Sequence, residues 1–296
     1  MSFSSEVKGE LVKNNAKARH CSLAELQALL TFSGYIVKEC DDRYTIVYKS
    51  ENIKIATKCF TLLRKTFNIK TDVMVRRNSA NYLQTYLLSA VGSEFEAIKN
   101  ASLQSACCKR AYIRGAFLAA GSISDPGKSY HFEVVCNDEM QAEHLRNIIN
   151  SFDVSAKIVK RKKHYVVYLK EGSQIVEILN IMEAHIALME LENVRIFKDV
   201  RNSVNRRVNC EAANINKTVS ASVRQVEDIS LIKDKMGIDK LPENLQDIAH
   251  VRLENPDAPL KELGQLLEVP IGKSGVNHRL RKLGEIAALL REKLGG

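Results

Sequence analysis

The sequence predicts an α+β body of two related halves, with helices on antiparallel sheets, followed by an all-α domain. Helix-like and strand-like segments alternate as far as residue 181, after which the strand signals disappear. Two apolar, small-residue-rich helices are each stopped by a glycine, at Gly34 and Gly121, and these glycines lie 87 residues apart. A repeat of this size predicts two pseudosymmetric halves and not a solenoid.

The first half is expected over residues 1–105. It begins with the helical segment Leu26–Ile36, which a glycine ends. Two strands, a helix, two more strands and a last helix follow in that order. These segments are the strands Tyr35–Glu39 and Tyr44–Lys49, the helix Asn52–Phe67, the strands Ile69–Arg76 and Tyr82–Leu88, and the helix Ser93–Ser102.

The second half, expected over residues 106–190, follows the same order, with one strand recognised after its first helix. Its segments are the helix Ile113–Ile123, the strand Tyr130–Cys136, the helix Asp138–Ser151, the strands Ala156–Lys160 and His164–Lys170, and the helix Gly172–Ile181. Gly34 and Gly121 are predicted to end their helices in the left-handed conformation, where glycine avoids the steric penalty of a Cβ.

The chain is basic, with 44 Lys and Arg against 35 Asp and Glu and a formal net charge of +9. A polyanionic partner fits this balance, and both nucleic acid and an anionic membrane have the required sign. No apolar run approaches the ~20 residues that span a bilayer, and the first residues lack the apolar core of a signal peptide. We therefore expect a cytoplasmic, nucleoid-associated protein with no membrane partner.

The cysteines give no sign of a metal site or of a disulfide framework. There are seven of them, an odd number, with no C-x-x-C spacing and no paired histidines. The adjacent Cys107 and Cys108 could suggest redox chemistry, but reduced thiols on or near a helix are the favoured interpretation. The sequence therefore predicts no metal, no cofactor and no small-molecule substrate.

Two segments follow the body: a basic helical connector over residues 191–236 and a helix-turn-helix domain over residues 237–296. Between Leu191 and Arg224, basic residues outnumber acidic residues by seven to three. Within this connector, Arg201 and Arg206 are expected to contact DNA phosphates.

The segment Pro259–Leu283 has the pattern of a helix-turn-helix. An inward stripe is expected on the first helix, and Gly264 is small enough for close helix contact. Ser274 is expected to cap the second helix after a turn at Val269–Lys273. The inward residues are Leu260, Leu263, Leu266 and Leu267 on the first helix and Val276, Leu280, Leu283 and Ala287 on the second.

The opposite face of the second helix carries side chains suited to a DNA major groove. Asparagine pairs with adenine and arginine with guanine through two hydrogen bonds each. The expected base-contacting residues are Ser274, Asn277, His278 and Arg281, and the expected phosphate-contacting residues are Lys273, Arg279 and Lys282. The alternative is a small helical hairpin with an ordinary solvated face.

The two glycine-stopped helices resemble those that name the LAGLIDADG homing endonucleases. In that fold an acid before each glycine holds a divalent metal, but here these degenerate positions are Ser33 and Ala120, which offer no carboxylate to hold Mg²⁺. We therefore expect a tight packing seam and no enzyme activity. A metal-dependent endonuclease that uses loop carboxylates such as Asp125, Asp41 or Asp42 is the alternative.

The chain as a whole resembles the WhiA family of bacterial DNA-binding regulators. The most specific segments are Met1–Glu6, Cys107–Ser122, Val194–Thr218 and Lys273–Leu283. The resemblance implies a degenerate LAGLIDADG body joined to a helix-turn-helix, double-stranded DNA as partner, and roles in transcription regulation, sporulation, cell division or chromosome segregation. It leaves open a further partner among transcription or division proteins, and an interaction module that docks on an acidic partner.

Overall fold

The computed structural model describes residues 2–16, 18–39, 43–69, 71–77 and 84–294. Contacts divide the chain into two compact units, Met1–Asp199 and Val200–Gly296, and the boundary falls within one helix, α8 (His185–Lys235). The residues expected to form a connector, 191–236, lie almost entirely in this helix. Among the described residues, no helix is long and apolar enough to cross a membrane.

The first half of the N-terminal unit contains one four-stranded antiparallel sheet, in the order β1-β2-β4-β3. Alternate residues of β2 are buried, which gives the sheet one core face. The elements are α1 (Phe3–Leu11), α2 (Arg19–Ser33), β1 (Gly34–Lys38), β2 (Tyr44–Ser50), α3 (Ile53–Phe67), β3 (Asp72–Arg77), β4 (Gln84–Gly92), η2 (Ser93–Phe95) and α4 (Glu96–Lys99).

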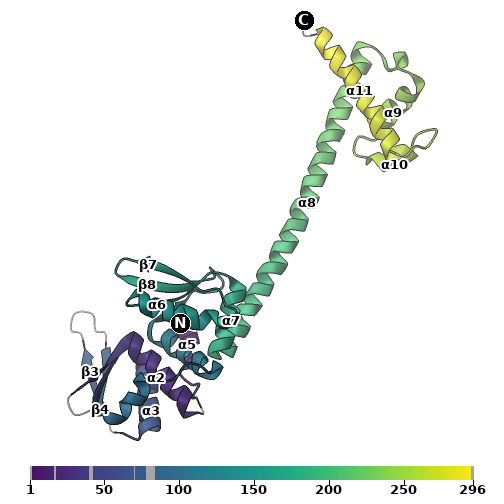
Figure 1. Cartoon of the computed structure of the whole chain (residues 1–296). Coiled ribbons are helices and arrows are strands. Elements are labelled where there is room, and N and C mark those ends of the chain that lie inside the picture. The colour runs from purple at the N-terminus through teal and green to yellow at the C-terminus, as the bar shows by residue number, and fades with distance from the viewer. Residues whose placement is uncertain (1, 17, 40–42, 70, 78–83, 295–296) are drawn as a thin grey trace. The chain divides into compact units, whose positions relative to one another are not determined.

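The second half has the same topology, with strand order β5-β6-β8-β7. Its elements are α5 (Ala106–Ala120), β5 (Gly121–Ile123), β6 (Phe132–Cys136), α6 (Glu139–Asn150), β7 (Lys157–Arg161), β8 (His164–Leu169) and α7 (Gly172–Met182). Figure 1 shows β3 and β4 of one half and β7 and β8 of the other in separate sheets, with α2 and α5 in the middle of the unit. The predicted α+β duplication is confirmed.

The helices α2 and α5 pack along one another, as expected for the seam between two halves. A Cβ on Gly115 would lie 2.6 Å from the Glu25 carbonyl oxygen and 2.8 Å from the Ala28 Cβ, so only glycine fits there. Near the other end of the seam, the Ser33 hydroxyl donates to the Ala119 carbonyl at 3.3 Å. Small residues thus set the distance between the halves.

The predicted left-handed conformation of Gly34 and Gly121 is wrong. Gly34 has φ −162° and Gly121 has φ −88°, both extended, because each glycine is already the first residue of a strand. Glycine is required at both positions because there is no room for a Cβ atom. A Cβ on Gly34 would lie 2.2 Å from the Val47 carbonyl oxygen of the neighbouring strand, and one on Gly121 would lie 2.3 Å from the Phe117 ring.

The core of the N-terminal unit contains a buried group of charges. The Glu25 carboxylate lies 2.9 Å from the Lys58 Nζ and 3.3 Å from an Arg114 guanidinium nitrogen, and Arg114 also lies 2.7 Å from Glu183. Burial lowers the pKa of Lys58, and the neighbouring Glu25 opposes this shift. The pKa of Arg114 is raised: burial alone would lower it, but the Glu25 and Glu183 carboxylates outweigh that effect. This group ties α2, α3 and α5 together.

The C-terminal unit is helical in its described residues. The later part of α8 is followed by η3 (Ile238–Lys240), α9 (Glu243–Glu254), α10 (Leu260–Gln265) and α11 (Lys273–Leu294). These elements share one apolar core, which includes Ile229 and Ile232 from α8. The end of α8 therefore belongs to the folded helix-turn-helix unit.

Two details of the predicted helix-turn-helix are wrong. Leu266 is 48% exposed, whereas Leu263 and Leu267 of the same predicted stripe are buried. Ser274 does not cap α11. The helix begins at Lys273, and the Gly272 carbonyl accepts its first hydrogen bond, from the Val276 N–H at 3.2 Å.

Candidate nucleic-acid interface

A glycine fixes the connection between α10 and α11. A Cβ on Gly264 would lie 2.2 Å from the Ile271 carbonyl oxygen and 3.1 Å from a Val276 methyl. The Ile271 N–H in turn donates to the Gly264 carbonyl at 3.0 Å. The two helices therefore meet as closely as the backbone allows, and α11 is held in one orientation.

The helix α11 has one buried and one exposed face. Val276, Leu280, Leu283 and Ala287 are buried, as the sequence predicts. The four expected base-contacting residues are all exposed and, at steps of three or four residues, lie on the outer side over two turns. They are Ser274, Asn277, His278 and Arg281. The fold thus brings them to one surface, and their contacts with bases stay a prediction.

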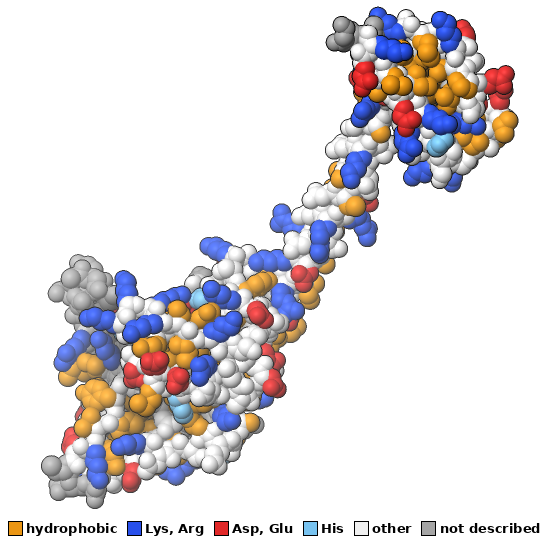
Figure 2. Space-filling view, turned by 45° about the horizontal axis from the view of Figure 1, so that its top comes forward, with side chains coloured by type: hydrophobic (Ala, Val, Ile, Leu, Met, Phe, Trp, Pro, Cys, Tyr) orange, Lys and Arg blue, Asp and Glu red, His pale blue; other side chains and the backbone are white. Residues whose placement is uncertain are grey.

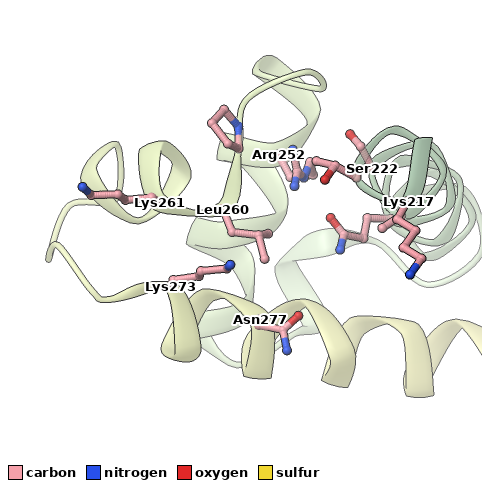
Figure 3. A pocket seen from close by; sticks show the side chains of 11 residues that line it. Lys217, Ser222, Arg252, Leu260, Lys261, Lys273 and Asn277 are labelled. Carbon is pink, nitrogen blue, oxygen red and sulfur yellow. The ribbon is translucent and has the colours of Figure 1, made fainter. Parts of the chain in front are cut away.

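Part of this surface borders a pocket within the C-terminal unit (Figure 3). Asn277 and Lys273 of α11 line it together with Lys217 and Ser222 of α8 and with Lys261 of α10. Lys273, at the start of α11, extends toward Leu260 in this view. A nucleic acid that contacts Asn277 would therefore also approach basic side chains of α8 and α10.

A second groove on the same unit contains Arg281. It is lined by Asn277 and Arg281 on one side and by Arg224 and Asp228 of α8 on the other. The Arg281 Nε lies 3.4 Å from a Glu285 carboxylate oxygen, and both side chains are exposed. An exposed pair at this helical spacing contributes only about 0.3–0.5 kcal/mol, so the guanidinium can exchange this partner for a base.

The expected phosphate contacts lie in different environments. Lys273 and Lys282 are exposed, whereas Arg279 is half-buried. On α8, Arg201 and Arg206 are exposed, and the Arg206 Nε donates to the Asn202 carbonyl at 3.3 Å. Figure 2 shows Lys and Arg side chains on the visible face of the C-terminal unit, with acidic and hydrophobic side chains among them.

One arginine that the sequence analysis missed shapes the entry to α10. Arg252 is buried, and its Nη1 donates to the carbonyls of Pro256 at 3.2 Å and Ala258 at 2.7 Å. Burial lowers the pKa of this guanidinium. Its carbonyl partners indicate a role in ordering the loop before α10, and no sequence signal distinguishes it from a solvated arginine.

The former metal positions of the body carry no carboxylate. Ser33 and Ala120 are half-buried at the ends of α2 and α5. Asp125 is committed to a turn, in which its Oδ1 accepts from the Gly127 N–H at 2.8 Å. Asp41 and Asp42 lie outside the described residues.

The structure also assembles a group that the sequence spacing hides. His20, Cys21, Cys107 and Cys108 converge at the beginnings of α2 and α5. Burial, reinforced by the neighbouring Cys107 and Cys108 thiols, raises the pKa of Cys21 to about 12. An offset of 87 residues, the same as between the two glycines, relates the two pairs and is the sequence signal that could have revealed them.

The two units together define a LAGLIDADG-like body without its metal-binding acids, combined with a helix-turn-helix domain. Three family models match the chain: the WhiA N-terminal LAGLIDADG-like domain at residues 19–89, the WhiA LAGLIDADG-like domain at 109–201, and the WhiA C-terminal HTH domain at 204–287. The chain belongs to the WhiA family.

Full-length relatives and solved structures agree with this assignment. The chain is 52% identical to the "Probable cell division protein WhiA" of Lachnoclostridium phytofermentans, over 99% of this chain and 100% of that protein. It is 46% identical to the protein of the same name from Alkaliphilus metalliredigens, over 99% of each chain. The crystal structure of full-length WhiA from Thermatoga maritima is 26% identical with a TM-score of 0.65, and covers 97% of this chain and 98% of that one.

Proposed function

We propose that this chain is a nonenzymatic DNA-binding protein that inserts the first turns of α11 into the major groove of double-stranded DNA. The observation that carries the proposal is the exposed row from Ser274 to Arg281, opposite a fully buried apolar face on a glycine-packed helix pair. A helix-turn-helix contacts base edges with this part of its second helix. The family match to a helix-turn-helix domain supports the same interpretation.

The proposal assigns two kinds of contact. Asn277, His278, Arg281 and Ser274 contact bases, and hydrogen bonds from these side chains give sequence preference. Lys273, Arg279 and Lys282, with Arg201 and Arg206 on α8, contact phosphates and supply salt-dependent affinity. Residues 1–105 and 106–190 form the two halves of the body and 191–236 the connector. The end of this connector, at Ile229 and Ile232, packs into the core of the DNA-binding domain, which residues 237–296 complete.

The biological role that we propose rests on the names of the relatives. Their name supports a role in cell division. The same proposal includes a role in transcription regulation, chromosome segregation or sporulation. It also includes a place in the cytoplasm at the nucleoid and a further partner among transcription or division proteins. Crosslinking in cells followed by sequencing of the bound DNA would test it, since binding concentrated at promoters would support transcription regulation.

Arg281→Ala tests the assignment of base contacts. The variant should weaken binding to the preferred site by about 1–3 kcal/mol and binding to random duplex by less, because a lost base contact costs specificity. Lys293→Ala is the matched control, since it removes one charge from an exposed site three turns further along the same helix. Equal losses on both duplexes would contradict base contact by Arg281.

The absence of nuclease activity has its own test. Hard oxygen ligands hold the divalent ion in metal-assisted phosphodiester cleavage, and Ser33 and Ala120 provide no carboxylate. Plasmid DNA incubated with the protein and Mg²⁺ or Mn²⁺ should therefore stay supercoiled. Nicking that EDTA prevents would show an active endonuclease and overturn this part of the proposal.

A further inference from the structure

Four side chains of metal-binding type meet where α2 and α5 begin. The ligand atoms of His20, Cys21, Cys107 and Cys108 all lie within 4.8 Å of one another. The His20 Nδ1 lies 3.1 Å from the Cys108 Sγ and 3.3 Å from the Cys21 Sγ. Within the described ranges this is the only group of three or more His, Cys, Asp or Glu side chains that could share an ion.

The four residues obey the internal symmetry of the body. The offset that relates Gly34 to Gly121 also relates His20 to Cys107 and Cys21 to Cys108. Each half therefore contributes an adjacent pair from the same place on the equivalent helix. Because α2 and α5 pack along one another, the two pairs converge between the halves.

We propose that these four residues bind one zinc ion in a Cys3His site that joins the two halves of the body. Zinc in structural sites is tetrahedral, with Zn–S bonds of about 2.3 Å and Zn–N bonds of about 2.0–2.1 Å. Such a site places its sulfur atoms about 3.8 Å apart. The four ligand atoms need to close by only about 1 Å from the 4.8 Å limit to reach this geometry.

The chemistry of the donors selects the metal. Three thiolates and one imidazole suit zinc, whereas magnesium and calcium require oxygen ligands. The compact spacing leaves room for a single ion, and an iron–sulfur cluster would spread its ligands over several irons. Four protein ligands leave no open position, which is typical of a structural and not of a catalytic zinc site.

The surroundings fit an ion that carries three thiolates. Cys21 and Cys108 are buried among small apolar residues, while His20 and Cys107 are exposed and line a cleft that reaches the group. Arg110 also lines this cleft. Its positive charge and the partial positive charge at two helix N-termini favour the net negative zinc–thiolate group. The former metal positions lie at the opposite ends of the same helices, so the inferred site is distinct from them.

Metal analysis of the tag-free full-length protein tests this inference. Protein incubated with excess Zn²⁺ and then gel-filtered should retain about one zinc per chain by mass spectrometry. Cys107→Ser should weaken zinc binding by more than about 100-fold, because loss of a direct ligand exceeds the 10–100-fold effect of losing an outer partner. Cys107 is exposed, so this small change leaves the core intact. Cys210→Ser removes an exposed thiol in the other unit and should leave binding unchanged.

Cobalt provides a second readout. Protein loaded with Co²⁺ should show the thiolate charge-transfer and tetrahedral d–d absorption bands, and His20→Ala and Cys107→Ser should lose them while Cys210→Ser keeps them. Less than about a tenth of an equivalent of zinc in the wild type, bound iron in place of zinc, or a disulfide between Cys21 and either Cys107 or Cys108 in the fresh protein would each overturn the inference. None of these results depends on DNA binding.

Discussion

Replacing Glu25 by glutamine should destabilise the N-terminal unit by about 3 kcal/mol. The Glu25 carboxylate is fully buried and lies 2.9 Å from the Lys58 ammonium and 3.3 Å from the Arg114 guanidinium. Glutamine keeps the shape of the side chain and removes its charge. Two buried cations then lose the counter-ion that they share.

The magnitude follows from the geometry. At a separation of about 3 Å and an effective dielectric constant of about 20, each ion pair is worth about 5–6 kcal/mol, and desolvation offsets most of this. Breaking a buried pair from one side costs about 3–5 kcal/mol, because the remaining charge stays buried. Arg114 keeps Glu183 at 2.7 Å and Lys58 keeps the Leu11 carbonyl at 3.0 Å, so the lower end applies.

The assay must report on the N-terminal unit alone, because a chain of two units need not unfold in one step. Hydrogen exchange of peptides from α2, α3 and α5 across a urea series gives this local stability. Glu183→Gln is the matched control: its carboxylate is 45% exposed and pairs with the same arginine, so the expected loss is below about 1 kcal/mol. Equal losses in the two variants, or a loss below 1 kcal/mol in Glu25→Gln, would refute the reasoning.

Three further predictions concern packing, pH and salt. Gly264→Ala should destabilise the C-terminal unit by about 1–3 kcal/mol, since its Cβ would meet the Ile271 carbonyl, whereas Gly272→Ala should be tolerated because nothing lies within 4 Å. Burial lowers the pKa of Lys8 from 10.5 to about 8, so the folded state is penalised below pH 8 and regains stability as pH rises to 10.5. Lys8→Met should reduce this rise in the urea midpoint, and the buried Lys58, whose pKa is also lowered, remains in the variant. Lys282→Ala should weaken binding equally on preferred and random duplexes and reduce the salt slope by about 1.

Each of these has a clear contrary result. Similar stability of the Gly264 and Gly272 variants would show that α10 and α11 can separate without cost. A wild-type midpoint that rises no more than that of Lys8→Met between pH 8 and 10.5 would mean that Lys8 is solvated. A loss for Lys282→Ala that is confined to the preferred duplex would make Lys282 a base contact and not a phosphate contact.

Much of the body could be predicted because its information is local and repeated. The residue pattern of strands such as β2, in which alternate residues are buried, can be recognised in the sequence itself. The same is true of the two helices that end at a glycine. The extended conformations of Gly34 and Gly121 could not be predicted, because each glycine begins a strand whose pairing partner, β2 or β6, lies further along the chain.

The candidate interface was predictable for a similar reason. The buried and exposed faces of α11 follow from the 3.6-residue period, so Asn277 and Arg281 could be placed outward from the sequence alone. Leu266 departed from the predicted stripe, since at the end of α10 only Leu263 and Leu267 reach the core. The grooves that set Asn277 opposite α8 likewise arise from packing between helices distant in sequence.

The sequence by itself determined the duplicated α+β body, the helical C-terminal domain, the loss of acids at Ser33 and Ala120, and the polar row on α11. Each of these is a property of residue type and spacing within one segment. Only the tertiary structure decided that Glu25 shares its charge between Lys58 and Arg114, and that His20 and Cys21 meet Cys107 and Cys108. Those groups come together because the equivalent helices α2 and α5 pack side by side and α3 brings Lys58 against them. The 87-residue offset relates the two His and Cys pairs along the sequence, but it does not encode their distance across that seam.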